Sequence, residues 1–156
     1  RPPHVMARRQ RQMCIRDRVS IEKRPAVVDQ RSRIGDWEID TIIGAHHQGV
    51  LLFLVERKSR LCLIARLANK SAQEVERTTI NLLDSIKEKV HTVTSDNGKE
   101  FAKHESIAKN LDAKFFFAHP YASWERGLNE NTNGFTRQYF PKKLNSTISR
   151  ISKSSR

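Results

Sequence analysis

Three acidic residues stand at positions where carboxylates could hold a divalent metal ion. Asp40 lies in an alternating stretch typical of a strand, Asp96 directly follows a second such stretch, and Glu130 lies in the first two turns of an expected helix. Carboxylate oxygens are hard ligands, the kind that Mg²⁺ binds in proteins. Paired Mg²⁺ ions about 3.5–4 Å apart stabilise the attacking and leaving oxygens of an in-line phosphoryl transfer. The three acids therefore indicate metal-dependent phosphoryl-transfer chemistry, provided that the fold brings them together.

Each acid also has an ordinary structural interpretation, which the residues alone leave open. Asp40 fits a solvated strand position equally well. Asp96 precedes Asn-Gly, where an aspartate commonly accepts a hydrogen bond from its own turn. Glu130 lies almost opposite the apolar stripe of its helix, which is typical of a solvent-facing glutamate. Spacing by itself does not establish an active site.

The elements that must position these acids can be read from the periodicity of residues 34–140. Residues 36–43 alternate, which predicts a half-buried strand with Asp40 on its polar face. Residues 50–55 are apolar on both faces, so we expect this strand at the centre of its sheet. A third strand at 61–67 follows a short turn, and the first three strands are predicted to form an antiparallel meander.

The period then changes to that of helices. Ser71 and Glu74 have the spacing of a capping box, and the apolar positions after them predict a helix at 72–89. A fourth strand is expected at 90–95, a helix at 100–112 and a fifth strand at 115–117. Pro120 precedes a last helix at about 125–140. This order predicts an α/β domain with a mixed sheet of about five strands flanked by helices.

The charge of the chain is concentrated at its two ends. The net charge of the 156 residues is +12, and residues 34–140 hold fourteen basic and fourteen acidic residues, so the excess lies outside them. A basic chain suggests a nucleic-acid partner, but here the charge does not belong to the expected folding unit. We expect residues 1–33 to be a basic leader or linker, disordered or not native, and residues 141–156 to be a basic, Ser-rich tail.

Several classes of protein are disfavoured by composition. No apolar run reaches the ~20 residues of a membrane span, and no signal peptide is apparent. Two cysteines without a CxxC pair fit a reducing compartment. A glycosidase needs two acids and no metal, and the aromatic content of 7% argues against a sugar-binding platform.

Three blocks, in order along the chain, carry a more specific signal. They are GDWEIDTIIG at 35–44, TSDNGKEF at 94–101 and PYASWERGLNENTNGFTRQYFP at 120–141. Together they resemble the integrase-core signature of bacterial insertion-sequence transposases of the IS-thirty family. The resemblance covers about residues 24–143, and the 33 residues between Asp96 and Glu130 match the family's spacing.

The resemblance implies a ribonuclease-H-like fold, similar to that of retroviral integrases, over residues 34–140. It implies a DDE triad of metal ligands at Asp40, Asp96 and Glu130, which holds Mg²⁺, with Mn²⁺ as a substitute. The implied activity is cleavage of the ends of an insertion sequence and strand transfer into target DNA, which results in DNA transposition and integration.

The same resemblance implies partners and further site residues. The partners are the terminal inverted repeats and the target DNA, and joining two ends suggests a homo-oligomer in the bacterial cytoplasm, at the nucleoid. Lys99, Arg126, Asn133 and Arg137 are candidate DNA contacts, and Asn97 and Lys99 are expected to support the acids.

An alternative function follows from what the sequence lacks. The helix-turn-helix region that precedes such cores has no counterpart in residues 1–33. The family pattern continues into further helices after the Phe-Pro-Lys segment, whereas this chain changes there to a Ser-rich tail. We therefore expect a fragment containing the catalytic core. The alternative is an inactive core fragment that acts only in DNA binding or assembly.

Overall fold

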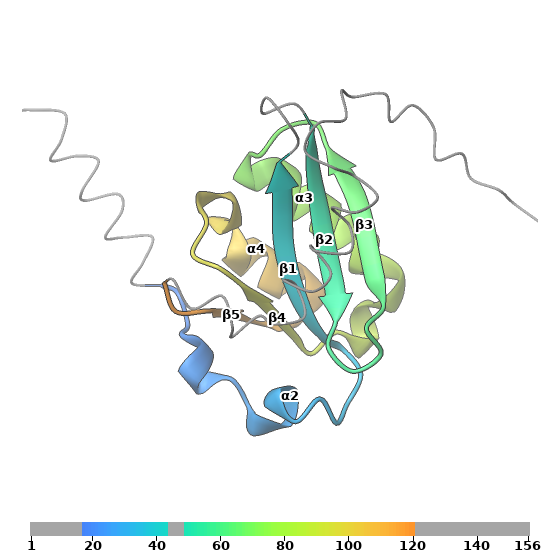
Figure 1. The fold of residues 1–156 in the computed structure, drawn as a ribbon, viewed down its shortest axis with the longest axis vertical. Helices are drawn as coiled ribbons and strands as arrows, with labels where there is room; N and C mark the ends of the chain where they lie inside the picture. The colour runs from blue at the N-terminus through green and yellow to red at the C-terminus, as the bar shows by residue number, and fades with distance from the viewer. Residues whose placement is uncertain (1–16, 44–48, 121–156) are drawn as a thin grey trace, which may run out of the picture.

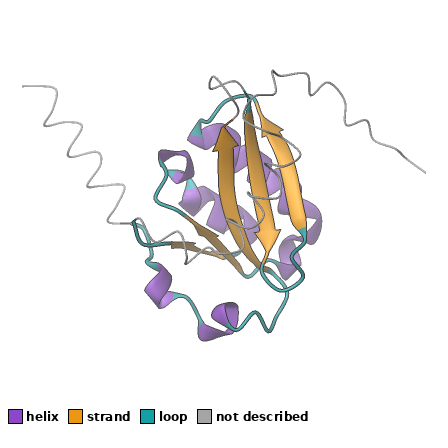
Figure 2. Cartoon of the chain, in the orientation of Figure 1, coloured by secondary structure: helices purple, strands orange, loops and turns teal. Residues whose placement is uncertain are grey.

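The computed structural model describes residues 17–43 and 49–120, which form a five-stranded sheet with helices on one face (Figures 1 and 2). The strands are β1 (Asp36–Ile43), β2 (Val50–Glu56), β3 (Cys62–Leu67), β4 (Thr92–Ser95) and β5 (Lys114–Phe117). Their order across the sheet is β3-β2-β1-β4-β5. β1 pairs with β2, and β2 with β3, in antiparallel fashion, whereas β1–β4 and β4–β5 are parallel. The predicted mixed sheet and its antiparallel meander are confirmed.

The prediction that β1 is half-buried is wrong for its first half. Asp36 is 1% exposed and Glu38 is 0% exposed, although both lie on the polar side of the alternation. On this face of the sheet the side chains of Arg33 and Arg57 cover the two acids. Arg33 donates two hydrogen bonds of 2.9 Å to the Asp36 carboxylate, and the Arg57 guanidinium pairs with Glu38. Buried carboxylates require such partners, which alternation alone does not reveal.

The helices differ from prediction in how they end and begin. α3 (Ala72–Leu83) starts as expected, because the Ser71 hydroxyl accepts a 3.2 Å hydrogen bond from the Glu74 N–H. It continues as the 3₁₀ helix η3 (Asp84–Lys89) instead of remaining α-helical, and such tightening is common at the end of a helix. The helix expected at 100–112 is divided into the 3₁₀ turn η4 (Lys99–Phe101) and α4 (His104–Leu111). This division allows Glu100 and Phe101 to be buried together.

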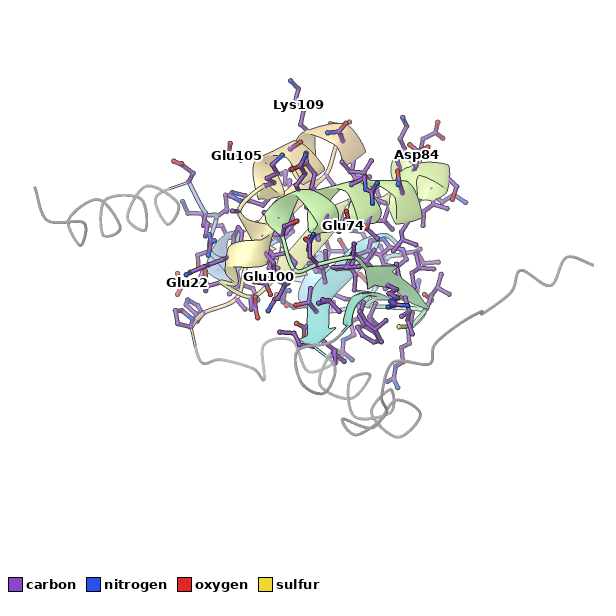
Figure 3. All side chains as sticks on the ribbon, turned by 90° about the horizontal axis from the view of Figure 1, so that it is seen from above. Glu22, Glu74, Asp84, Glu100, Glu105 and Lys109 are labelled. Carbon is purple, nitrogen blue, oxygen red and sulfur yellow. The ribbon has the colours of Figure 1, made fainter. Side chains whose placement is uncertain are left out.

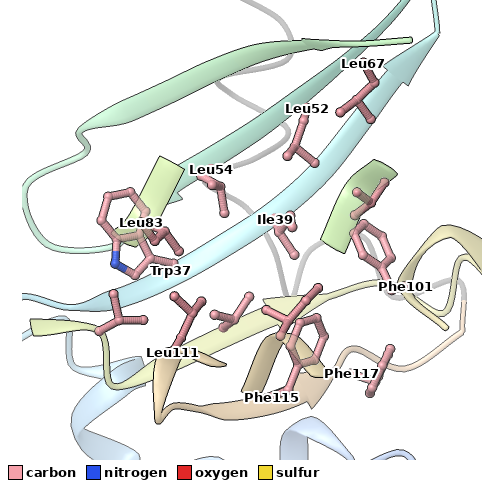
Figure 4. Close-up of a cluster of buried hydrophobic side chains, with 14 of the residues drawn as sticks. Trp37, Ile39, Leu52, Leu54, Leu67, Leu83, Phe101, Leu111, Phe115 and Phe117 are labelled. Atoms are coloured by element: carbon pink, nitrogen blue, oxygen red, sulfur yellow. The ribbon is translucent and has the colours of Figure 1, made fainter. Parts of the chain in front are cut away.

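The core lies between the sheet and the helices α3 and α4 (Figure 4). The core contains side chains from the inward faces of β1 and β2 and from the buried faces of the helices. Side chains of β4 and β5 also contribute to it. The buried side chains include Trp37, Ile39, Leu52, Leu54, Val75, Leu83, Phe101, Ile107, Leu111, Phe115 and Phe117. Burying each large side chain stabilises the fold by about 1.5–3 kcal/mol. This layer holds β1 and β4 in fixed register.

Residues 17–33 are part of the folded unit and do not form a separate leader. They contain the short helices η1 (Ile21–Lys23) and α2 (Ala26–Asp29), below β4 and β5 in Figure 1. Ser20 forms a parallel bridge with Phe117, Val28 is 0% exposed, and the buried Arg24 donates to the Thr94 hydroxyl at 3.2 Å. Elements of three or four residues have no detectable period, which explains why the sequence did not predict them.

Some expectations fall outside the described residues. These are the helix at 125–140, the tail at 141–156 and residues 1–16 of the expected leader. Among the helices that the structure does describe, none combines the length and hydropathy needed to cross a membrane.

Candidate active site

Asp40 and Asp96 belong to neighbouring parallel strands. The pairing of β1 with β4 matches Glu38 to Thr94. Asp40 lies two residues beyond Glu38 in β1, and Asp96, the residue that follows β4, lies two residues beyond Thr94. Neighbouring strands lie about 4.8 Å apart. The fold therefore has both predicted acids where the β1–β4 pairing ends, an edge where α/β sheets commonly bind ligands.

The local contacts of these two acids suit a cation site. Both side chains are half-buried. Asp40 Oδ1 accepts a 2.8 Å hydrogen bond from the Thr41 N–H, and Asp96 Oδ1 accepts one of 2.8 Å from the Gly98 N–H. The second contact is the turn interaction that the sequence left open as an alternative. An ionised carboxylate offers about four acceptor positions, so one accepted N–H is compatible with metal ligation.

The loop after β4 is anchored from several sides, which fixes the position of Asp96. The Asn97 amide donates a 2.6 Å hydrogen bond to the Ala118 carbonyl, beyond the end of β5. The Arg18 guanidinium donates to the Asn97 carbonyl at 2.9 Å and to the Gly98 carbonyl at 3.3 Å. These bonds fix the Asn97 side chain and backbone next to Asp96, and its support of the acids stays a prediction. Lys99, which follows this loop, is exposed.

Glu100 is a third carboxylate near this edge, and the sequence did not single it out. It is 8% exposed, and its Oε1 atom accepts a 2.9 Å hydrogen bond from the Thr41 hydroxyl. Lys70 Nζ lies 2.7 Å from the same oxygen. Glu100 stands within the second matching block, but only its burial and its contacts distinguish it from an ordinary helix-start glutamate.

The charge of Glu100 is stabilised by its neighbours. Burial raises the pKa of Glu100, but hydrogen bonds from Lys70 and Thr41, together with the charge of Lys70, lower it more. The pKa of Glu100 consequently lies below its ordinary value of 4.5, so the group is ionised at neutral pH. Lys70 and Glu100 thus form an ion pair at the edge where Asp40 and Asp96 lie.

The remaining predicted site residues cannot be placed in this geometry. Glu130, Arg126, Asn133 and Arg137 lie outside the described residues. Within residues 17–43 and 49–120, no group of three or more His, Cys, Asp or Glu side chains is arranged to hold a metal ion. The donor chemistry of Asp40 and Asp96 nevertheless fits a divalent cation, because carboxylate oxygens are its preferred protein ligands.

The mixed five-stranded sheet and its helices have the ribonuclease-H-like fold of a retroviral-integrase core. The family model of the integrase core domain matches residues 30–123. The chain therefore belongs to the integrase core domain family.

Solved structures agree with this fold. The catalytic core domain of BIV integrase superposes with a TM-score of 0.54 at 21% identity, covering 67% of this chain and 72% of that one. A simian T-cell lymphotropic virus intasome, in complex with PP2A regulatory subunit B56 gamma, superposes with a TM-score of 0.58 at 16% identity. That match covers 72% of this chain and 44% of the other.

Two of the curated relatives are bacterial transposases. The chain is 51% identical over 125 residues to the transposase for insertion sequence element IS4351 of Bacteroides fragilis, which covers 80% of this chain and 38% of the relative. It is 37% identical over 124 residues to transposase InsI for element IS30A of Escherichia coli K12, covering 79% and 32%. The predicted resemblance to the IS-thirty family is confirmed, and the chain spans about a third of the length of these relatives.

Proposed function

We propose that the chain is the catalytic core of a DDE transposase, a polynucleotidyl transferase that moves an insertion sequence. The observation that carries this proposal is that Asp40 and Asp96 lie two residues beyond Glu38–Thr94, the last matched pair of the parallel strands β1 and β4. Family membership and the transposase relatives support the same function.

Asp40, Asp96 and Glu130 act as metal ligands in this proposal, with Mg²⁺ as the ion and Mn²⁺ as a substitute. The three carboxylates contribute negative charge and oxygen donors, and none of them serves as a nucleophile. A bound divalent ion would activate the attacking hydroxyl and stabilise the leaving oxygen. The chain's own task is to hold the ligands at a fixed separation.

The reaction has two steps, and neither requires a covalent protein intermediate. In the first step, water attacks the phosphorus at the element's end, the P–O3′ bond breaks, and a 3′-OH is released. In the second step, this 3′-OH attacks a phosphodiester of the target DNA, so that one P–O bond forms as another breaks. Both steps are phosphoryl transfers and use the same acids.

The DNA partners are the terminal inverted repeats of the element and the target DNA. Lys99 is exposed directly after the loop of Asp96, where a cation can contact a phosphate. Arg126, Asn133 and Arg137 are proposed as further DNA contacts. Joining two ends calls for a homo-oligomer, and the bacterial cytoplasm, at the nucleoid, is where this DNA is found.

The test is metal-dependent cleavage and strand transfer on terminal-inverted-repeat DNA. We expect product with Mg²⁺ or Mn²⁺, none with EDTA, and a loss of at least about 100-fold in Asp96→Asn. The matched control is Asp84→Asn, which removes an exposed carboxylate from η3, on the helical side of the sheet (Figure 3). Its activity should equal that of the wild type.

Two outcomes would contradict the proposal. Cleavage that survives EDTA would rule out a metal-dependent mechanism. DNA binding without cleavage under every metal condition would instead favour the alternative of an inactive core that acts only in binding or assembly.

A further inference from the structure

Asp40 and Asp96 lie just beyond the backbone ladder that joins their strands. The matched pairs of β1 and β4 run from Asp36–Thr92 to Glu38–Thr94, and β4 ends at Ser95. The separation of the two acids therefore depends on contacts other than this ladder.

Glu100 provides such a contact. Its Oε1 atom accepts the 2.9 Å hydrogen bond from the hydroxyl of Thr41, the residue that follows Asp40, across 59 positions of sequence. The N–H of the same Thr41 donates to Asp40 Oδ1 at 2.8 Å. Side chains alternate along a strand, so Thr41 reaches Glu100 on the helical side of the sheet while Asp40 lies on the other face. One residue thus connects Asp40 to Glu100.

Gly98 connects Glu100 to Asp96. The Gly98 N–H donates to Asp96 Oδ1 at 2.8 Å. A Cβ added at Gly98 would lie 2.3 Å from Glu100 Oε2 and 2.9 Å from Asp96 Oδ1. Both carboxylates therefore lie close against this glycine. Its φ of –56° suits any residue, so a side chain here would act by displacing the ends of these two carboxylates.

Lys70 completes the arrangement. Its ammonium, which lies 2.7 Å from Glu100 Oε1, comes from the segment that precedes α3. A carboxylate with a relative exposure of 8% needs a charged partner, because burying an unpaired charge is costly. Glu100 accordingly joins three segments: the end of β1, the start of α3 and the loop after β4. Figure 3 shows Glu100 between the helices and the sheet, whereas Glu105 and Lys109 lie on the outer side of α4.

We propose that Glu100 is a positioning residue, which sets the separation of Asp40 and Asp96 through Thr41, Gly98 and Lys70. This inference rests on the proposed metal site. Glu100 need not touch the metal ion itself. Outer contacts of this kind commonly change metal affinity by about 10–100-fold.

The experiment measures the Kd of Mn²⁺ alone for the full chain by isothermal titration calorimetry. Thr41→Val keeps the β-branched shape and removes the hydroxyl that binds Glu100, so we expect its Kd to rise about tenfold. Thr41→Ser retains the hydroxyl and should stay within about twofold of the wild type. Glu100→Gln leaves the Lys70 charge unpaired near the site and should also weaken binding about tenfold.

Controls separate positioning from loss of structure. Glu105→Gln removes an exposed glutamate of α4 and should leave the Kd unchanged. In the absence of metal, Thr41→Val and Thr41→Ser should have matching midpoints of thermal unfolding. If Thr41 only stabilised the fold, two variants of equal stability would bind Mn²⁺ with equal affinity. Tighter binding by Thr41→Ser at equal stability therefore supports the positioning role. Asp40→Asn should abolish Mn²⁺ binding.

Two results would contradict the inference, and they are distinguishable. Wild-type affinity in both Thr41→Val and Glu100→Gln, with Asp40→Asn defective, would overturn the positioning role and leave the metal site intact. No Mn²⁺ binding to the wild type, or unchanged binding in Asp40→Asn, would overturn the metal site and the inference together.

Discussion

The buried ion pair between Arg57 and Glu38 offers a direct test of how β1 is held. Glu38 is 0% exposed at the centre of the sheet, and Arg57, which follows β2, is 5% exposed. Arg57 Nη1 pairs with Glu38 Oε1, and Arg57 Nε donates to the Val28 carbonyl at 3.1 Å. The perturbation is Arg57→Met, which keeps an apolar side chain of similar length and removes the guanidinium.

The expected loss is about 3 kcal/mol of unfolding free energy. Removing one partner of a buried pair generally costs about 3–5 kcal/mol, and the lost bond to Val28 adds to this. One neighbour offsets part of the loss. Burial and the charge of Arg57 lower the pKa of Arg24, whereas Glu38 raises it, so Arg24 remains a cationic neighbour of Glu38 and is relieved of repulsion from Arg57. We therefore expect the lower end of the range.

The assay is urea unfolding followed by far-UV circular dichroism at neutral pH. In a separate thermal unfolding experiment, a loss of about 3 kcal/mol corresponds to a fall of roughly 10 °C in Tm for a domain of this size. The double variant Glu38→Met/Arg57→Met should be less destabilised than the sum of the two single variants, with a coupling of about 2 kcal/mol.

An exposed ion pair provides the matched control. Arg77 also pairs with a glutamate, Glu74, at 2.9 Å, but its side chain is 69% exposed. Arg77→Met should change stability by less than about 0.5 kcal/mol. If Arg57→Met costs no more than this control, or the two buried-site variants are additive, the reasoning about the buried pair is refuted.

Three further predictions concern stability. In Gly35→Ala, the new Cβ would lie 1.8 Å from the Lys89 carbonyl oxygen at a φ of +107°, so urea unfolding should show a loss on the order of 3 kcal/mol; a loss under about 1 kcal/mol would contradict this. Phe101→Ala empties a fully buried position and should cost about 3–5 kcal/mol in the same assay, whereas a near-neutral result would show that the core collapses around the site. Burial raises the pKa of Glu56, but hydrogen bonds from Ser59 and nearby N–H groups lower it below 4.5. The stability this group contributes is present above that pH and is lost as the pH falls through the lowered pKa. The gap between wild type and Glu56→Gln should therefore narrow on acidification, and a constant gap would refute the assignment.

The sequence by itself determined the main elements and suggested the acids of the site. Strands β1 to β3 and helix α3 are long enough for a period of two or of 3.6 residues to be recognised. Asp40 and Asp96 were proposed from the end of a strand pattern and from the matching blocks, and both lie two residues beyond the last matched pair of β1 and β4. The placement of Glu130 stays a prediction.

Only the tertiary structure decided which polar residues are buried and what they contact. The alternation of β1 placed Glu38 on the polar face of a half-buried strand, yet Arg57, which follows β2, covers that carboxylate. Glu100 looked like any glutamate at the start of a helix until its contact with Thr41 was known. Periodicity describes a residue relative to its neighbours along the chain, whereas these partners come from segments that only strand pairing and packing bring together.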